Sequence, residues 1–349
     1  MKIHPDLYHG KNKKKNFFEG WYFKIVDKTG KNSIAFIPGI SFGKKKAENH
    51  SFVQVVDAIN NSYHYYRFKP DSFSSNEDFL HVKIDNNSFS YNKISINLFK
   101  DNDFIKGTLQ LSQFIKWPDS KINPGSMGFY NHLSFMECYS QVCAVDGTII
   151  TGSLEINGHV YDFSEGKFYI EKNWGNSFPS SWLWIQSNNF TDNRASVTCS
   201  LGIVPFPIIK KFRGFLIGVT IDTHFYSFTT INRSSLSLKN CKNDLILTSI
   251  NKNLTLILKT KTDPQDFLSC LGPRNGNMVP LVDETLRGEV EMTLIDHKKK
   301  KIIYHGVGKS TGIEYGGNQN EILDAYCKKS TMKLTELFPK KSASKQATP

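Results

Sequence analysis

Apolar and polar residues alternate along most of the chain with the two-residue period of β-strands. The run "FFEGWYFKIV", residues 17–26, is one example. Successive side chains of a strand point to opposite faces, so Glu19 and Trp21 share one face, and Tyr22 and Lys24 share the other. We expect Lys24 to reach water and Glu19 to face the apolar interior, where a carboxylate needs a partner or a proton.

Similar short runs continue from Phe17 to about Gly312, and turn residues separate them. Tight-turn signals occur at Asp85, Val145 and Ile156. Many short strands at this spacing predict an all-β fold, a sandwich or a barrel. A helical pattern occurs near the end, around residues 321–337. We therefore predict two antiparallel β-barrel or sandwich domains with a short C-terminal helix.

The 349 residues are enough for two domains. The two halves open in a similar way, with "FFEGWYF" near residue 20 and "FYIEKNWG" from Phe168. We place the boundary at residue 165. The prediction is an N-terminal β domain over residues 1–165, a C-terminal β domain over 166–335, and a disordered tail over 336–349.

The net charge of +12 comes from 44 Lys and Arg against 32 Asp and Glu. Much of it lies in lysine runs such as "KNKKK", "KKK" and "HKKKK". Such runs are typical of solvated turns, and they also suit an anionic membrane surface as a partner. We expect no nucleic-acid partner, because no recognition motif accompanies the charge.

The six cysteines are scattered and form no C-x-x-C pair, and the ten histidines show no metal-ligand spacing. We therefore predict reduced thiols and no metal. The first ten residues lack the apolar core of a signal peptide, and no apolar run reaches the ~20 residues of a membrane span. These features predict a cytoplasmic protein, with peripheral association with a membrane as an option.

Several strands embed polar groups among aromatic rings, which marks candidate site residues. Phe135, Glu137, Tyr139 and Gln141 are expected on one strand face. Three glutamates are the candidate acids: Glu171 first, then Glu19 and Glu137. The candidate substrate-binding residues are Trp21, Tyr22, Tyr139, Asn173, Trp174, Trp182, Trp184 and Gln186. The structural alternative stays open, because indoles dominate β-cores and each glutamate could pair with Arg67, Arg213 or a lysine.

The same stretches resemble the tocopherol cyclase family. The similarity includes "YHG" at Tyr8, "FFEGWYFK", "FIPGI", "PGSMGFY", "FMECY", "YIEKNWGNSFPSSWLWIQSNNF", "FRGF" and a closing "GIEYGG". These motifs keep their order from about His4 to Gly317. The resemblance implies a lipocalin-like β architecture and a cofactor-independent, isomerase-type cyclase that closes a chromanol ring on a prenylated hydroquinone. The lysine- and asparagine-rich chain looks like a bacterial member, so the resemblance supports the reaction class more than tocopherol itself.

Closing a chromanol ring adds a phenol O–H across a trisubstituted alkene. The acid must stay protonated near neutral pH, which burial among apolar rings achieves. Aromatic faces stabilise the tertiary cation, and water must be excluded. A barrel interior lined by Trp, Tyr and Phe with a buried Glu would meet these needs. Two alternatives stay open, a carrier of isoprenoid lipids and an isoprenoid hydratase.

One further segment, residues 201–212, combines apolar residues with Pro205, Pro207 and two lysines. Proline lacks an N–H for a ladder, so we predict a loop here. An apolar loop flanked by lysines would suit docking to an anionic membrane, while a buried plug between the barrels is the structural alternative.

Overall fold

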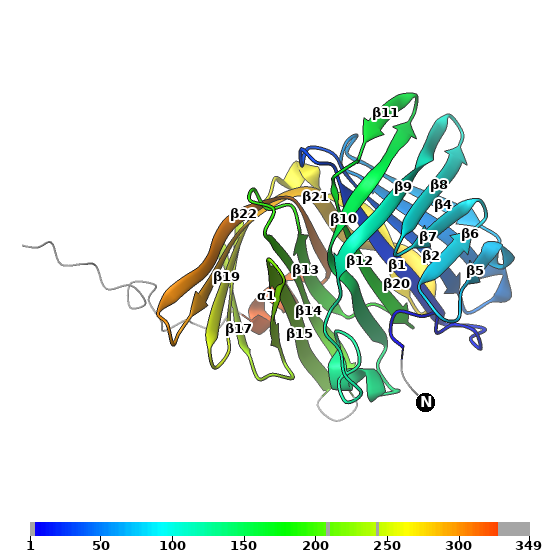
Figure 1. Cartoon of the computed structure of the whole chain (residues 1–349). Coiled ribbons are helices and arrows are strands. Elements are labelled where there is room, and N and C mark those ends of the chain that lie inside the picture. Colours follow the sequence, from blue (N-terminus) through cyan, green and yellow to red (C-terminus); the bar gives the residue numbers. More distant parts are fainter. Residues whose placement is uncertain (1–3, 207–209, 242–243, 327–349) are drawn as a thin grey trace, which may run out of the picture.

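The computed structural model describes residues 4–206, 210–241 and 244–326, and within these ranges the chain is nearly all β. The strands form two curled antiparallel sheets that lie side by side (Figure 1). The predicted all-β fold of two lipocalin-like antiparallel sheets is confirmed. Its short C-terminal helix, α1, spans Gln319–Tyr326; the rest of the predicted helix and the predicted disordered tail lie outside the described residues.

The first sheet, blue to green in Figure 1, follows the order β4-β3-β2-β1-β12-β10-β9-β8-β7-β6-β5, with β11 paired to β10. Its strands are β1 (Phe17–Val26), β2 (Ser33–Phe42), β3 (His50–Asp57), β4 (Ser62–Phe68), β5 (Phe73–Ser75), β6 (His81–Ile84), β7 (Asn87–Ser90), β8 (Lys93–Lys100), β9 (Asp103–Ile115), β10 (Cys138–Ile156), β11 (His159–Asp162) and β12 (Lys167–Gly175).

The second sheet, green to orange in Figure 1, follows the order β16-β15-β14-β13-β22-β21-β19-β18-β17, with β20 paired to β21. Its strands are β13 (Ser181–Ser187), β14 (Ala195–Phe206), β15 (Lys210–Ile221), β16 (His224–Thr229), β17 (Ser235–Cys241), β18 (Asp244–Ile250), β19 (Leu254–Lys261), β20 (Leu268–Arg274), β21 (Asn277–Asp296) and β22 (Lys301–Gly317).

The chain passes from the first sheet to the second between Gly175 and Ser181, because β12 pairs with β1 and β10 while β13 pairs with β14 and β22. This crossover lies a few residues after the boundary predicted at residue 165. Whether each half is a domain in the sense of independent folding stays a prediction.

Each sheet encloses its own apolar core. Trp21, Phe23 and Ile170 belong to the core of the first sheet, and Leu183 and Ile185 to that of the second. Two smaller clusters join residues of both sheets, so the central strands are buried on both faces. On these central strands, the side chains that alternation turns away from the core therefore meet the other sheet rather than water.

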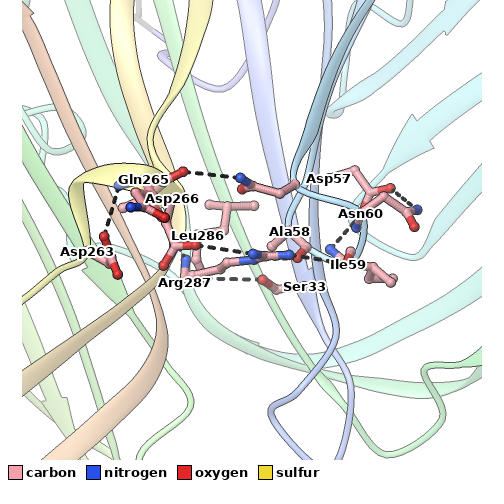
Figure 2. A network of polar contacts seen from close by, with 12 residues as sticks. Ser33, Asp57, Ala58, Ile59, Asn60, Asp263, Gln265, Asp266, Leu286 and Arg287 are labelled. Carbon is pink, nitrogen blue, oxygen red and sulfur yellow. Dashed lines mark hydrogen bonds and ion pairs between the residues drawn. The ribbon is translucent and has the colours of Figure 1, made fainter.

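A polar clamp ties the two sheets together (Figure 2). Arg287 of β21 donates from Nε to the carbonyl oxygen of Ala58 at 2.7 Å and from Nη2 to that of Ile59 at 3.2 Å. Its Nη1 lies 3.1 Å from a carboxylate oxygen of Asp266. The Ser33 hydroxyl donates to the carbonyl oxygen of Leu286 at 3.3 Å. The planar guanidinium fork thus fixes the turn after β3 against the second sheet.

Two sequence predictions of turns or loops are wrong. Residues 145–147 lie within β10, so the chain does not reverse there. The pairing of β10 with β12 shifts its register between Ala144 and Gly147, as at a β-bulge. Residues 201–206 and 210–212 lie in β14 and β15, whereas 207–209 lie outside the described residues. Pro205 is tolerated because the pairing of β14 with β13 ends at Ile203, so Pro205 has only β15 as a neighbouring strand.

Docking of this segment to a membrane stays a prediction, and no helix in the described ranges is long and apolar enough to span one.

Candidate active site

A cavity of about 210 Å³ lies between the two sheets. The sequence predicted a site inside a barrel, but side chains of each sheet's own core fill these interiors. Most of the cavity lining is apolar or aromatic, and both sheets contribute to it. Six of the predicted site residues line it: Tyr22, Tyr139, Glu171, Asn173, Trp182 and Trp184. Two glutamates that the sequence analysis did not select, Glu284 and Glu314, also line it.

Strand register places the polar residues in two facing rows. In the first sheet, Tyr22 of β1 lies opposite Glu171 of β12. In the second sheet, Trp184 of β13, Glu314 of β22 and Glu284 of β21 are successive cross-strand partners. Cross-strand partners project from the same face. The two rows therefore bring three carboxyl groups and their aromatic neighbours into one cavity.

Glu171 is 5% exposed and receives several hydrogen bonds. Ser140 Oγ donates to its Oε1 at 3.0 Å, and Tyr169 Oη and Trp184 Nε1 donate to its Oε2 at 2.6 and 2.8 Å. Burial raises the pKa of Glu171, and these donors, together with Asn173, oppose that rise because they favour the carboxylate. The face of β12 that carries Tyr169, Glu171 and Asn173 thus points into the space between the sheets.

Glu284 and Glu314 form a pair of facing carboxyl groups. Tyr22 donates its phenol proton to Glu284, and Trp182 donates its indole N–H to Glu314. Burial raises the pKa of Glu284 to about 7. The pKa of Glu314 lies well above its ordinary value, first because of burial and then because of the negative charge of Glu284. Such a pair holds a proton near neutral pH.

Two glycines explain how indole rings come to flank Glu314. On β22, Gly312, Glu314 and Gly316 share one face. A Cβ at Gly316 would lie 1.9 Å from the ring of Trp182, and one at Gly312 would lie 2.6 Å from that of Trp184. The alternating glycines of "GIEYGG" thus leave room for one indole on each side of the carboxyl group.

Lys24 is 1% exposed, so the prediction that it reaches water is wrong. The second sheet covers the face of β1 that carries it, and its Nζ donates to Gln186 Oε1 at 2.7 Å. Burial lowers the pKa of Lys24 to about 7, against an opposing effect of the negative charge on Glu284. Gln186 is therefore engaged by Lys24 and lies outside the cavity lining.

Glu19 faces the core of the first sheet, as the alternation predicted, and lies outside the cavity lining. Its Oε1 lies 2.5 Å from Lys172 Nζ, and the backbone N–H of His9 donates to its Oε2 at 2.8 Å. Its cationic partner is a lysine, whereas Arg67 and Arg213 bond to the backbone carbonyls of Glu48 and Ala325. The structural reading of Glu19, a carboxylate held by a buried cation, fits this geometry.

Trp21 and Trp174 belong to the same buried site. Lys172 Nζ lies 4.9 Å from the ring centroid of Trp21 and 4.8 Å from that of Trp174. The His9 ring stacks on Trp174 with centroids 4.3 Å apart. These indoles enclose a protein cation and do not line the cavity.

Glu137 and Phe135 precede β10, so their predicted place on a strand face with Tyr139 and Gln141 is wrong. The ladder between β10 and β12 ends at the pair Cys138–Gly175, because the chain turns away at Gly175, whose φ is +142°. Glu137 instead accepts the N–H of Asn176 at its backbone carbonyl and lies outside the cavity lining.

Tyr139 lines the cavity and is held from two sides. Its ring stacks on Trp174 with centroids 5.2 Å apart, and its hydroxyl donates to the carbonyl oxygen of Leu133 at 2.6 Å.

Sequence reasoning missed Glu284 and Glu314 although a signal was present. Glu284 alternates with Val282 and Leu286, both buried, and Glu314 lies within the quoted "GIEYGG" motif. An acid on an otherwise apolar strand face is the same pattern that drew attention to Glu19. Among the described residues, no group of three His, Cys, Asp or Glu side chains is placed to hold a metal ion.

The fold and the site define a two-sheet, lipocalin-like protein with an acidic, aromatic cavity between its sheets. A sequence model of the tocopherol cyclase-like family matches residues 100–317, and the chain belongs to this family. This range includes Glu171, Glu284 and Glu314 and excludes Tyr22 and Lys24.

Two plant proteins are similar in sequence. One is the probable chloroplastic tocopherol cyclase of Oryza sativa subsp. japonica, 27% identical over 54% of this chain and 42% of that protein. Another is the chloroplastic tocopherol cyclase of Zea mays, 31% identical over 32% of this chain and 24% of that protein. The chain thus spans less than half the length of either relative.

The fold is similar to that of CghA, solved with Sch210972. The TM-score is 0.53 at 8% identity, and the match covers 86% of this chain and 89% of that one.

Proposed function

We propose that this protein closes a chromanol-type ring by adding the phenol O–H of a prenylated hydroquinone across its nearest prenyl double bond. The observation that carries this proposal is the meeting of three glutamates, the buried Glu171 and Glu284 and the half-buried Glu314, with aromatic rings in one cavity between the sheets. The names of the plant relatives support the substrate class.

The cavity offers what the reaction requires. A carboxylic acid transfers its proton to the less substituted alkene carbon and leaves a tertiary carbocation. A lone pair of the phenol oxygen forms the C–O bond, and the phenol proton returns to a carboxylate. The product is an isomer of the substrate, so no oxidant or reductant is consumed. General acid catalysis of this kind typically contributes ~10²–10⁴-fold.

The surroundings of the acids favour the cation over hydration. The rings of Tyr22 and Trp184 lie 5.2 Å apart in an edge-to-face arrangement, and Trp182 completes the aromatic side. A cation over a desolvated aromatic face gains about 2 kcal/mol. Apolar lining keeps water from capturing the cation. Asn173 and Tyr139, which line the same cavity, are suited to contact the polar head group.

The test is turnover of purified protein with hydroquinones that carry prenyl chains of increasing length. A product of unchanged mass that has lost a free phenol supports the cyclase. A gain of one water identifies a hydratase, and bound but unchanged ligand identifies a carrier; either result contradicts the proposal.

A variant pair connects turnover to the cavity. Glu171→Gln keeps the shape but removes a carboxyl group, so we expect turnover to fall ~10²-fold or more. Glu291→Gln is the matched control, since Glu291 of β21 pairs with Lys259 near the surface and does not line the cavity. Equal turnover of wild type and Glu171→Gln would remove Glu171 from the site.

A further inference from the structure

We propose that Glu284 and Glu314 share a single proton, that Glu314 delivers it to the substrate, and that Lys24 of the facing sheet favours the ionised form of Glu284 over that of Glu314. This inference rests on the proposed function and assigns the acid within the same site. Glu314 is then the catalytic residue, and Glu284 and Lys24 are positioning residues.

The first step is the geometry of the pair. Glu284 and Glu314 are direct cross-strand partners on β21 and β22. Side chains directly opposite each other start ~5 Å apart at Cβ, and like charges there repel. In an apolar cavity the repulsion is relieved when one group keeps a proton, as in other buried carboxyl pairs.

Accessibility then separates the two groups. Glu284 is 3% exposed and accepts a hydrogen bond from the Tyr22 hydroxyl, whereas Glu314, which accepts one from the Trp182 indole, is only half-buried. The indoles of Trp182 and Trp184 flank Glu314 over the two glycines of β22. A substrate alkene held between these rings meets Glu314 before it meets Glu284.

Lys24 makes the electrostatic surroundings of Glu284 and Glu314 different. It lies on β1, on the same face as Tyr22, and its positive charge favours the ionised form of Glu284. Burial raises the pKa of Glu314 most, and the negative charges of Glu284 and Glu171 raise it further, with no opposing effect from Lys24. Glu171 itself accepts hydrogen bonds from Ser140 and Trp184, which favour its ionised form. A carboxylate there would lie beside the developing cation.

Four other titratable groups that face the pair stay neutral near pH 7. Burial raises the pKa of the phenols of Tyr22 and Tyr63, and it also raises the pKa of the thiols of Cys138 and Cys270. These groups face the pair from β1, β4, β10 and β20, and none of them carries a charge that would reverse the asymmetry.

In the reaction, the Glu314 O–H bond breaks as its proton bonds to the alkene carbon, and Glu314 becomes a carboxylate. The phenol oxygen captures the cation, and the phenol O–H proton passes to the Glu314 carboxylate. The pair returns to its starting state with one proton, and every atom of the substrate is retained in the product.

The test is infrared spectroscopy of the substrate-free protein, which detects the C=O band of a protonated carboxyl group at pH 7. We expect a band in wild type that is lost in Glu314→Gln and kept in Glu171→Gln. A band that disappears in Glu171→Gln and persists in Glu314→Gln would overturn the assignment, as would a wild type without any such band. Since no substrate is present, this result is independent of whether the protein is a cyclase.

Variants of Lys24 and of Glu284 test the positioning roles. Lys24→Met should let Glu284 keep a proton too, so the band at pH 7 should grow, and the pH profile of turnover should shift while Lys24→Arg restores it. Glu284→Gln removes the negative neighbour of Glu314, so the pH midpoint of the band should fall. An unchanged midpoint in a folded Glu284→Gln protein would contradict the shared proton even if the Lys24 variants do not fold.

Discussion

Strand β12 carries Lys172 on one face and Glu171 on the other, so two buried polar sites lie within one strand's thickness of each other. On the first face, Glu19 meets a lysine at 2.5 Å and a backbone N–H, and two indoles enclose the cation. On the second face, Glu171 meets hydroxyl and indole donors, and further glutamates lie across the cavity. Both sites are an acid among aromatic rings, yet their charge balance differs.

The difference indicates which acid is available for chemistry. The charge of Glu19 is compensated by a buried lysine, and removal of either partner would leave an unpaired charge in a core. In the cavity the glutamates outnumber the cations that face them, so a carboxyl group is kept protonated by burial and by its neighbours. Aromatic surroundings are common to both sites, so they do not by themselves single out the proposed active site.

The largest effect that separates the two sites is on stability. Lys172→Met leaves Glu19 buried without its cation, and we expect the free energy of unfolding to fall by ~3–5 kcal/mol. Denaturant unfolding measures this loss. The double variant Lys172→Met, Glu19→Gln should recover most of it, because no charge is then left unpaired. A single variant as stable as wild type would show that the ion pair does not support the core.

An effect of intermediate size is the pH dependence of the free energy of unfolding, which distinguishes the cavity from the Glu19–Lys172 site. Burial raises the pKa of Glu284 from 4.5 to about 7, so the folded protein keeps a proton that the unfolded chain has released. The contribution of Glu284 is therefore fully present below pH 4.5 and is lost as pH rises to about 7, by about 3 kcal/mol for the full shift. Burial lowers the pKa of Lys24 from 10.5 to about 7. Its contribution to stability is therefore fully present above pH 10.5 and is lost as the pH falls from 10.5 to about 7.

These opposite trends predict that the two groups together contribute least to stability near pH 7. Unfolding of wild type and Glu284→Gln, measured from pH 4 to pH 7, gives the comparison. The wild type should lose stability with rising pH relative to the variant. Parallel curves would mean that Glu284 titrates normally in the folded protein.

The smallest effects come from a matched pair of indole substitutions. Trp184→Phe removes one hydrogen bond to Glu171 and should cost about 1–2 kcal/mol of stability. Loss of this donor should also raise the pKa of the Glu171 carboxyl group, because the hydrogen bond favours the carboxylate. The pH profile of turnover should then move upward. Trp174→Phe weakens a cation–π contact of Lys172 and should cost about 1 kcal/mol of stability without moving the profile. A shift of the profile in Trp174→Phe would connect the two sites that the structure separates.

Alternation along single strands was enough to predict the all-β class. It also predicted that Glu19 faces an apolar interior. These predictions depend on the period of two residues and on the cost of burying an unpaired charge, both of which act within a short stretch of sequence. The family resemblance added the candidate reaction and drew attention to the motif that contains Glu314.

Which face meets which neighbour was decided by tertiary structure alone. Lys24 was expected in water because lysine is rarely buried, but packing of the second sheet buries it. Pairing of β21 with β22 brings Glu284 opposite Glu314 from positions that are 30 residues apart in the sequence. Alternation specifies two faces of every strand, but only the packing of the sheets determines whether a face meets solvent, its own core or the cavity.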